Sequence, residues 1–469
     1  MRFWKKNKKR VMIIGLDCAA PELVFDQWLD ELPNIRSLVQ AGAWGPLRSC
    51  DPPITVPAWS CMMSSKSPGT LGVYGFRNRA DYSYDKLSIA NSTAIKADRV
   101  WDILSRAGKN CLVIGVPQTY PIRPINGKLV SCFLTPDTKV QYTYPPEFRD
   151  EVEKVVGEYI IDCRDFRSDN RDKILADIYE MTEKRFKLAR HLLDREDWDF
   201  FMMVEMGTDR IHHAFWQYMD KTHRKHEPGH KFARAIHDYY LYLDKEIGSL
   251  LKFADENTTV LIVSDHGAKK MDGGVCVNEW LMREGYLTLA EKPASPVPLG
   301  KAKVDWTKTK VWGDGGYYAR VFLNVKGREP QGTVDPKDYE ALRDELIRKI
   351  EAIPDDTGKP MGTKVFKPQQ LYKQINNVAP DLLVYFGDLL WRSVGSVGLN
   401  SIYTFENDTG PDDANHAQYG MFIVRPPNGG FAGQKLDGVR LFDVAPTVLR
   451  ILDLPIPADM EGNVFPVYR

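Results

Sequence analysis

The sequence predicts an α/β protein with a largely parallel sheet, helices on both faces of that sheet, and an inserted cap region. Four apolar runs without polar alternation support this prediction, and they lie at 11–16, 111–116, 198–204 and 260–263. Uninterrupted apolar runs are typical of strands that are buried on both faces of a parallel sheet. Segments with helical patterns separate the runs, as expected when strands and helices alternate along the chain.

The expected helices are predicted from the spacing of apolar residues and from the Gly and Pro residues at their ends. Gly42 ends one of them and Gly108 ends another, while Pro57 suits the first turn of a third. The expected helices lie at 21–32, 32–40, from about 55 onward, and at 99–107, 173–193, 237–253 and 441–452.

The segment 270–375 differs in character from the rest of the chain. Its stretch 292–310 is rich in Pro and Lys, and it is followed by an expected strand at 317–325, a helix at 335–352 and a further strand at 364–374. The run 378–385 returns to the buried-strand pattern. We therefore expect a catalytic core formed by 11–269 and 376–469, an insertion or cap at 270–375, and a solvated basic tail at 1–10.

Composition narrows the function classes. The 469 residues contain 63 Lys plus Arg and 63 Asp plus Glu, so no net field favours nucleic acid or an anionic membrane. The seven Cys residues are scattered without a CxxC pair, which argues against a disulfide framework and suits a reducing cytoplasm. The apolar run 11–16 is too short for a signal peptide or a transmembrane segment. No pattern indicates an oligomeric state.

Polar residues stand where the expected strands end. Asp17 follows the first strand, Asp265 and His266 follow another, and Asp209 lies just beyond the strand at 198–205. The carboxyl ends of parallel strands meet at one edge of a sheet, which is where ligands bind in such folds. His213 shares a helix face with Asp209, four residues earlier. A cluster of carboxylates and imidazoles is typical of a divalent metal site.

Two further residues complete this constellation. His416 supplies another imidazole from a loop, and Thr55 supplies a hydroxyl near a helix N-terminus, where an anion is favoured. The whole set suits two divalent ions in one cleft. One ion lowers the pKa of a hydroxyl nucleophile, and the other stabilises the leaving oxygen of an in-line displacement.

These segments resemble the alkaline phosphatase superfamily, specifically its type I phosphodiesterase/nucleotide pyrophosphatase branch. The resemblance covers the chain from residue 11 to its end, except 270–375, and no single motif carries it alone. The matching motifs are GLDCA at 15–19, ITVPAWS at 54–60, GTDRIHH at 207–213, SDHG at 264–267, NHAQYG at 415–420 and DVAPTVLRILDLPIPADMEG at 443–462. The resemblance implies an alkaline-phosphatase-like core.

The resemblance also implies roles for individual residues. Asp17, Thr55, Asp265 and His266 would surround one metal ion, with Thr55 as the nucleophile, while Asp209, His213 and His416 would hold the other. In the family, an Asn hydrogen-bonds a phosphate oxygen. Asn78 in GVYGFRN is its nearest match here, although it lies slightly more residues after Thr55 than the family's Asn lies after its nucleophile. Zinc is our first choice of metal, and such mixed Asp/His sites also accept manganese or iron.

The expected function is hydrolysis of a small-molecule phosphodiester or pyrophosphate, a nucleotide being one option, through a phosphothreonine intermediate. A phosphomonoesterase or phosphomutase of the same superfamily is the alternative. The stretch 55–59 lacks the Arg that alkaline phosphatases proper and sulfatases carry near the nucleophile, although an Arg from the insertion could replace it. A catalytically inactive binding or regulatory protein is the alternative from another class.

Other candidates have simpler explanations. We expect His212 to pack or to support the site rather than to bind metal. His223, His226, His230 and His237 suit a solvated loop better than a third metal site. Trp312 and the pair Tyr317-Tyr318 would either stack on a substrate ring or pack within the insertion.

Overall fold

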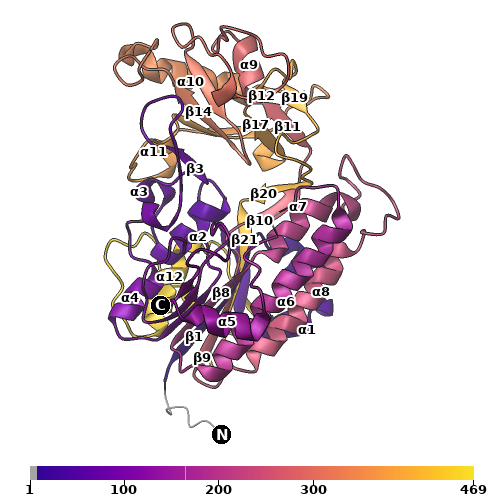
Figure 1. The fold of residues 1–469 in the computed structure, drawn as a ribbon, viewed down its shortest axis with the longest axis vertical. Coiled ribbons are helices and arrows are strands. Elements are labelled where there is room, and N and C mark those ends of the chain that lie inside the picture. The colour runs from indigo at the N-terminus through magenta and orange to yellow at the C-terminus, as the bar shows by residue number, and fades with distance from the viewer. Residues whose placement is uncertain (1–7, 164, 469) are drawn as a thin grey trace.

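In the computed structural model, which describes residues 8–163 and 165–468, a nine-stranded sheet forms the centre of a lower lobe (Figure 1). Strands β9, β1, β8, β5 and β6 run parallel, whereas β21, β2 and β7 each join an antiparallel pair. The spatial order is β22 (Gln434–Lys435), β2 (Ala43–Arg48), β21 (Tyr419–Arg425), β9 (Thr258–Val263), β1 (Arg10–Leu16), β8 (Phe200–Glu205), β5 (Cys111–Ile114), β6 (Gly127–Val130) and β7 (Thr143–Tyr144). The predicted fold class is confirmed.

Helices cover both faces of this sheet, as Figure 1 shows. Side chains of β1 alternate between the two faces: Met12 and Ile14 belong to one apolar core, and Val11 and Ile13 to the other. The first core includes residues of α1 (Pro33–Ala41), α5 (Phe148–Val156), α6 (Arg171–Arg195), α7 (Gly207–Met219) and α8 (Ala235–Leu251). The second includes residues of α2 (Thr55–Ser64), α4 (Val100–Arg106) and α12 (Val444–Ile451).

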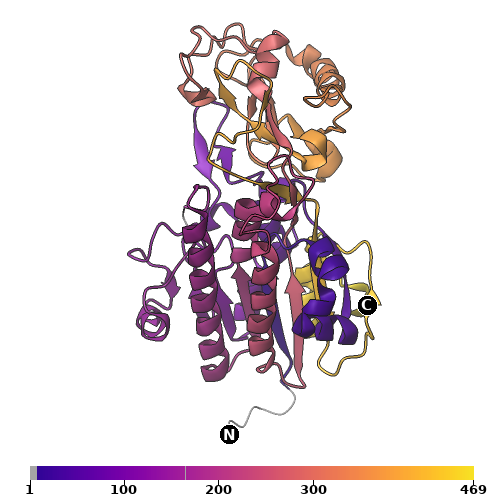
Figure 2. The same cartoon turned by 90° about the vertical axis from the view of Figure 1, so that its right-hand side faces the viewer.

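An upper lobe stands beyond the carboxyl ends of the central strands (Figures 1 and 2). It has its own apolar core, which contains Val275, Val321 and Leu346. Its strands are β13 (Val311–Asp314), β14 (Ala319–Leu323), β16 (Leu382–Tyr385) and β15 (Lys364–Phe366) in one sheet, β17 (Trp391–Val394), β11 (Gly273–Cys276) and β19 (Tyr403–Thr404) in another, and the pair β12 (Val297–Pro298) and β18 (Ser396–Val397). Its helices include α9 (Val277–Arg283) and α10 (Tyr339–Glu351).

Three features connect the lobes. The hairpin of β3 (Arg77–Arg79) and β4 (Leu87–Ile89) reaches the upper lobe, where Arg79 pairs with Glu329 at 3.2 Å. Strand β10 (Gly267–Lys270) pairs with β20 (Ala414–Ala417). A small apolar cluster contains Ile54 from the lower lobe and Tyr318 from the upper, near the short helices α3 (Pro68–Leu71) and α11 (Pro368–Leu371).

The structure corrects the domain boundaries. Strand β16 pairs with β14 and β15 in the upper lobe, so the chain has not returned to the core at residue 376. It rejoins the large sheet only with β21. Residues 1–7 of the expected tail lie outside the described residues, and Arg10 belongs to β1 and is buried, with its guanidinium 2.5 Å from Asp255.

Two predicted elements are also wrong in part. The expected helix at 21–32 is a short π-helix, η1 (Glu22–Gln27), followed by a 3-10 turn, η2 (Leu29–Glu31), because Trp28 leaves helical geometry to pack on Tyr240. The expected strand at 364–374 ends at Phe366, since Pro368 begins α11. The remaining 3-10 turns are η3 (Ser92–Ala94), η4 (Leu299–Lys301), η5 (Pro336–Asp338), η6 (Phe386–Leu389), η7 (Leu441–Asp443) and η8 (Pro466–Tyr468).

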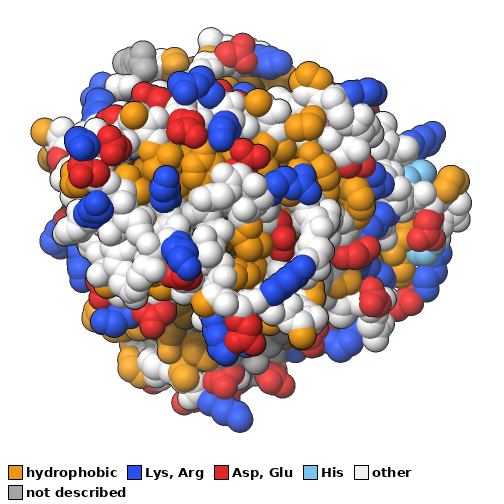
Figure 3. Space-filling view, turned by 90° about the horizontal axis from the view of Figure 1, so that it is seen from above, with side chains coloured by type: hydrophobic (Ala, Val, Ile, Leu, Met, Phe, Trp, Pro, Cys, Tyr) orange, Lys and Arg blue, Asp and Glu red, His pale blue; other side chains and the backbone are white. Residues whose placement is uncertain are grey.

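The surface agrees with the balanced composition. Seen from above, basic and acidic side chains are interspersed over the upper lobe, with apolar areas between them (Figure 3). Within residues 8–163 and 165–468, no helix combines the length and the apolar character needed to cross a bilayer.

Candidate active site

The carboxyl ends of three neighbouring strands supply most of the site. Strands β9, β1 and β8 lie side by side in parallel register, so the residues that follow them are brought together. Asp17 follows β1, Asp265 and His266 follow β9, and Asp209 lies in the first turn of α7 after β8. All four side chains are buried. The predicted convergence of these strand ends is therefore what the structure has.

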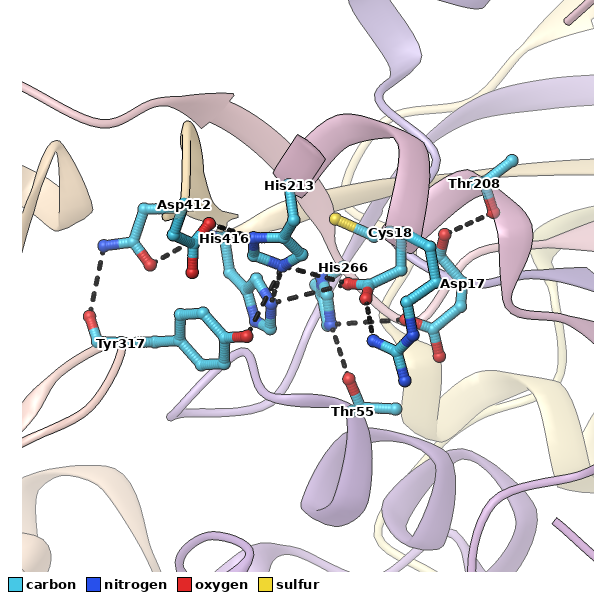
Figure 4. Close-up of polar contacts among 12 residues, drawn as sticks. Asp17, Cys18, Thr55, Thr208, His213, His266, Tyr317, Asp412 and His416 are labelled. Carbon is cyan, nitrogen blue, oxygen red and sulfur yellow. Dashed lines mark hydrogen bonds and ion pairs between the residues drawn. The ribbon is translucent and has the colours of Figure 1, made fainter. Parts of the chain in front are cut away.

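His416 reaches the same place through a long-range strand pairing. Ala268 of β10 lies opposite His416 of β20, and the rings of His266 and His416 stack with centroids 3.8 Å apart. Figure 4 shows the imidazoles of His213, His416 and His266 between Asp412 on one side and Asp17 on the other.

Thr55 is the first residue of α2, and its hydroxyl faces the site. Its Oγ1 atom lies 3.2 Å from Nε2 of His266 (Figure 4). One helical turn later, the Nε1–H group of Trp59 donates a hydrogen bond of 2.7 Å to Oδ2 of Asp17. The start of α2 thus presents the hydroxyl, and its next turn holds the carboxylate of Asp17.

The ligand atoms fall into two neighbouring groups. Atoms of Asp17, Asp265 and His266 lie within 4.8 Å of one another, and so do atoms of Asp209, His213 and His416. These groups agree with the two ligand sets that the family resemblance implies. Cys18 forms a third such combination with His266 and His416, and its thiol donates to the carbonyl oxygen of Gly267 at 3.3 Å.

The histidines are oriented to offer Nε2. The Nδ1 atom of His416 lies 2.9 Å from the carbonyl oxygen of Pro53, and that of His266 lies 3.2 Å from the carbonyl oxygen of Gly267. A proton on Nδ1 satisfies these acceptors and leaves the Nε2 lone pair for a metal ion. The Nε2 atoms of His213 and His266 lie 3.3 Å from Asp209 Oδ1 and 3.2 Å from Asp265 Oδ2, respectively.

The carboxylates fit a metal site because their inward-facing oxygens lack other partners. Within the described part of the chain, Asp17 Oδ1, Asp209 Oδ1 and Asp265 Oδ2 are buried and accept no hydrogen bond. Buried oxygens without a partner cost free energy, and divalent ions would remove that cost. The donor set of carboxylate oxygens and imidazole nitrogens matches zinc, manganese or iron.

The pKa shifts of the three carboxylates also fit a site for cations. Burial raises the pKa of Asp17, and the charge of Asp209 adds to the shift. Burial also raises the pKa of Asp265, assisted by the charge of Asp17. Burial opposes ionisation of Asp209 as well, but the charges of His213 and Arg210 bring its pKa well below the usual range. Carboxylates crowded in a dry site repel one another, and cations between them relieve this repulsion.

Asp412 is a site residue that the sequence analysis missed. Its Oδ1 atom lies 2.6 Å from Nδ1 of His213, while its Oδ2 atom accepts from Arg167 at 3.0 Å and from Arg392 at 3.1 Å. A carboxylate on the outer nitrogen of a metal-binding His fixes the ring and increases its basicity. Its place four residues before His416 was the available signal.

A cavity of about 450 Å³ opens beside Thr55 and Asp209. Residues of both lobes line it, including Gly315, Gly316 and Tyr317 from the upper lobe. Its basic side chains are Arg77, Arg167, Arg210, Arg320 and Arg392, and its aromatic rings include those of Phe76, Phe133 and Phe166. The arginines that are missing beside Thr55 in the sequence are thus supplied from distant segments.

Asn78 is placed differently from the expectation. Its Oδ1 atom accepts from the backbone N–H of Tyr74 at 2.8 Å, and its Nδ2 donates to the carbonyl oxygen of Gly75 at 3.0 Å. The amide therefore closes its own turn, and its neighbours Phe76 and Arg77 line the cavity instead. This geometry does not support the expected contact with a phosphate oxygen.

The other five histidines considered in the sequence analysis contact protein groups outside the two ligand groups. His212 stacks on Tyr240, and burial lowers its pKa to about 3, as suits a packing residue. The Nε2–H group of His223 donates to the carbonyl oxygen of Asp413 at 3.1 Å, and His237 packs edge-on against Trp28. Both are buried, so the expectation of a solvated loop is wrong for them. His226 lies 2.9 Å from the carbonyl oxygen of Gln217, and His230 stacks on Tyr218.

The aromatic candidates divide between two roles. Trp312 packs in the upper lobe against Trp306 and Phe322, and the hydroxyl of Tyr318 donates to the carbonyl oxygen of Tyr74. Tyr317 lines the cavity and stacks on His416 with centroids 3.8 Å apart. Of the three, Tyr317 is the one that faces both the ligand group and the cavity.

Residues 11–412 match the family model described as type I phosphodiesterase / nucleotide pyrophosphatase. Curated protein sequences give no match. Among solved structures, human ectonucleotide pyrophosphatase / phosphodiesterase 5 is 11% identical over 97% of both chains with a TM-score of 0.54. Phosphonoacetate hydrolase from Sinorhizobium meliloti 1021, in complex with phosphonoacetate, is 14% identical over 95% of this chain and 96% of its own, with a TM-score of 0.63.

A murine relative has the same degree of similarity. Ectonucleotide pyrophosphatase / phosphodiesterase 5 from mouse, as an inactive threonine-to-alanine variant in complex with AMP, is 11% identical over 96% of both chains with a TM-score of 0.53. At these identities the likeness establishes the fold.

Proposed function

Because the chain belongs to the type I phosphodiesterase / nucleotide pyrophosphatase family of the alkaline phosphatase superfamily, we propose that it hydrolyses phosphodiesters or pyrophosphates through a covalent intermediate on Thr55. Family membership makes the chain a phosphoester-hydrolysing enzyme. The threonine nucleophile, the two-metal site and the preference for diesters are the proposed parts.

One observation carries the proposal. Two separate groups of Asp and His ligand atoms lie beside one buried hydroxyl, and each group contains a carboxylate oxygen that has no hydrogen-bond partner among the described residues. Asp17, Asp265 and His266, together with Thr55, would hold one divalent ion, zinc being our first choice. Asp209, His213 and His416 would hold the other.

Bound divalent ions supply two effects, a lower pKa for a hydroxyl and neutralisation of charge on phosphate oxygens. The chain supplies position and direction. Thr55 is buried at the edge of the cavity, and the 3.2 Å contact with His266 holds Oγ1 beside the ligand groups. Thr55 is also the first residue of α2, and the N-terminus of a helix favours phosphate oxygens.

The proposed reaction has two displacements. The Oγ1 atom of Thr55 forms a bond to phosphorus as the bond to the leaving alcohol or phosphate breaks, and the hydroxyl proton ends on the leaving group. Water then attacks the phosphothreonine, which releases the second product and restores the hydroxyl.

Replacing Thr55 tests the proposal. The Thr55→Ala variant is expected to retain its fold and both metals but to lose most turnover of a 4-nitrophenyl diester, and Thr55→Ser is expected to keep part of it. Turnover and metal content are measured on the same preparations. Near-normal turnover by the alanine variant would show that water is the direct nucleophile and would end the covalent mechanism.

A nucleotide substrate is one version of this proposal. The mouse relative in complex with AMP motivates including nucleotide diesters in the panel. The cavity beside Thr55 carries aromatic rings such as Phe76 and Phe166 on which a base could stack.

The phosphomonoesterase or phosphomutase alternative now has an observation in its favour. Arg320 from the upper lobe and Arg392 line the cavity, so positive charge for a dianionic phosphate is present despite its absence from 55–59. Comparing monoesters with diesters separates these reactions. Full metal loading without turnover of either class would favour the inactive binding protein.

A cytoplasmic location also stays a proposal. Its support is that all seven Cys residues are free and buried, as is common for proteins of a reducing compartment.

A further inference from the structure

Arginines and aromatic rings alternate along one wall of the cavity beside Thr55. Each guanidinium carbon lies within 6.0 Å of the centroid of a neighbouring ring, which is the range of a cation–π contact. The order along the wall is Phe133, Arg210, Phe166, Arg167, Tyr317 and Arg392. Such stacking holds the guanidinium planes in place before a ligand arrives.

The carboxylates on this wall are unevenly shared among its three arginines. Arg210 is matched, because Asp162 receives two of its donors at 3.0 and 2.7 Å and Asp209 receives another. Arg167 and Arg392, in contrast, share the single carboxylate of Asp412, which also faces His213. Burial and the charge of Arg167 lower the pKa of Arg392, although Asp412 opposes this shift.

Two arginines that line the cavity keep unused hydrogen-bond donors, Arg392 on this wall and Arg77 elsewhere in the lining. Arg392 is 6% exposed, and its Nε–H group is buried with no partner in the described part of the chain. Arg77 is exposed at the cavity, and no described residue forms an ion pair or hydrogen bond with its guanidinium. A buried cation with a free donor is costly unless a ligand completes it.

We propose that this wall, together with Arg77 of the cavity lining, binds a second anionic group, a carboxylate or a phosphate, on the organic part of the substrate. The proposal rests on the phosphoester hydrolysis proposed above and adds the substrate class. Guanidinium forks suit these planar or tetrahedral oxyanions, and they disfavour a substrate with a cationic organic group. Substrates would therefore carry charge at two separated positions.

Binding measurements test the proposal without relying on turnover. The probes are propylphosphonate, 2-carboxyethylphosphonate, ethylene-1,2-bisphosphonate and 2-aminoethylphosphonate, which share the phosphonate and differ at the far end of a short chain. Calorimetry on metal-loaded wild-type protein should show about tenfold or tighter Kd values for the carboxylate or bisphosphonate probe than for propylphosphonate. The relative affinities of those two probes distinguish a carboxylate site from a phosphate site.

Variants assign the effect to the wall. Arg77→Gln and Arg392→Gln should bring the affinity for the two probes with a second anionic group, 2-carboxyethylphosphonate and ethylene-1,2-bisphosphonate, close to that for propylphosphonate. Arg283→Gln, at the exposed end of α9 and outside the cavity lining, is the matched control and should retain the preference. Metal content and the unfolding midpoint are recorded for each variant. If Arg392→Gln disturbs Asp412, the Arg77→Gln variant still tests the proposal.

The outcomes separate this inference from the proposed function. The inference would be overturned by equal Kd values for propylphosphonate and the two probes with a second anionic group. It would also be overturned if both arginine variants kept the preference for those two probes. Turnover of 4-nitrophenyl ethyl phosphate and 4-nitrophenyl 2-carboxyethyl phosphate, with Thr55→Ala as reference, tests hydrolysis separately. If the wild type hydrolysed neither diester but still bound the probes with a second anionic group more tightly through its arginines, only the proposed function would be rejected.

Discussion

His213 and Asp412 are joined by a 2.6 Å contact between Nδ1 and Oδ1, and both side chains are buried. The other oxygen of Asp412 accepts hydrogen bonds from Arg167 and Arg392 of the cavity wall. One carboxylate thus connects a candidate metal ligand to two arginines of the cavity lining. On the two proposals above, metal affinity and substrate affinity both depend on Asp412.

Replacing Asp412 should weaken one metal position. Without the carboxylate, the ring of His213 is less firmly oriented and less basic, and such changes typically cost about 10- to 100-fold in metal affinity. We expect Asp412→Asn to retain about one ion after dialysis, where the wild type retains two. Asp413→Asn is the control, because burial raises the pKa of Asp413 to about 7 and its carboxylate faces Arg171 rather than His213. Equal metal content in the two variants would contradict this role.

Trp59 should stabilise the fold through its hydrogen bond to Asp17. Trp59→Phe removes the donor that lies 2.7 Å from Asp17 Oδ2 and leaves that oxygen buried. The expected loss beyond the change in packing is about 1–3 kcal/mol in the free energy of unfolding. Trp101→Phe is the matched control, since Trp101 is buried and its Nε1–H has no partner within the described residues. Denaturant unfolding of both variants measures the difference, and equal losses would argue against the hydrogen bond.

Removing divalent ions should lower thermal stability. The three carboxylates of the site keep buried oxygens without partners when no cation is bound, and they repel one another. A ligand present at 100 times its Kd stabilises the folded state by about 2.7 kcal/mol. Calorimetry with and without EDTA should therefore show a clear decrease in Tm. In Asp265→Asn the effect of EDTA should shrink, and an unchanged effect would place the ions elsewhere.

Stability of the metal-free protein should fall in acid partly because of His212. Its pKa is lowered from 6.5 to about 3 by burial, so below about pH 6 the unfolded state binds a proton that the folded state does not. This contribution to stability is present above pH 6.5 and decreases by about 1.4 kcal/mol per pH unit as the pH falls toward 3. Unfolding of His212→Phe from pH 7 to 5 should show a shallower dependence than the wild type. The same slope in both proteins would exclude His212 as its source.

Asp17, Asp265 and His266 could be identified from the sequence because each follows a strand whose apolar run is visible locally. The i, i+4 spacing of Asp209 and His213 likewise depends only on helix geometry. Neighbouring parallel strands then bring these short segments to one sheet edge. The motif around His416 was recognised by resemblance to the family, whereas its contact with His266 depends on the pairing of β10 with β20.

Other features were decided by tertiary structure. The sequence shows β16 as another buried strand, and only its pairing with β14 and β15 assigns it to the upper lobe. Deleting 270–375 would therefore remove the partners of β16 as well as Tyr317 and Arg320 from the cavity, so point variants test the cavity more cleanly. Asn78 carried a plausible motif, but local hydrogen bonds to Tyr74 and Gly75 use its amide.

By itself, the sequence determined the α/β class, the strands that end at the site and most of the candidate ligands, because apolar periodicity and polar strand ends are local signals. Tertiary structure alone decided which charges line the cavity. Arg77, Arg167, Arg320 and Arg392 come from four distant segments, and an arginine in a loop has no local pattern that distinguishes a solvated side chain from one facing a cavity. That difference arises only when the two lobes meet and place these side chains around one cavity.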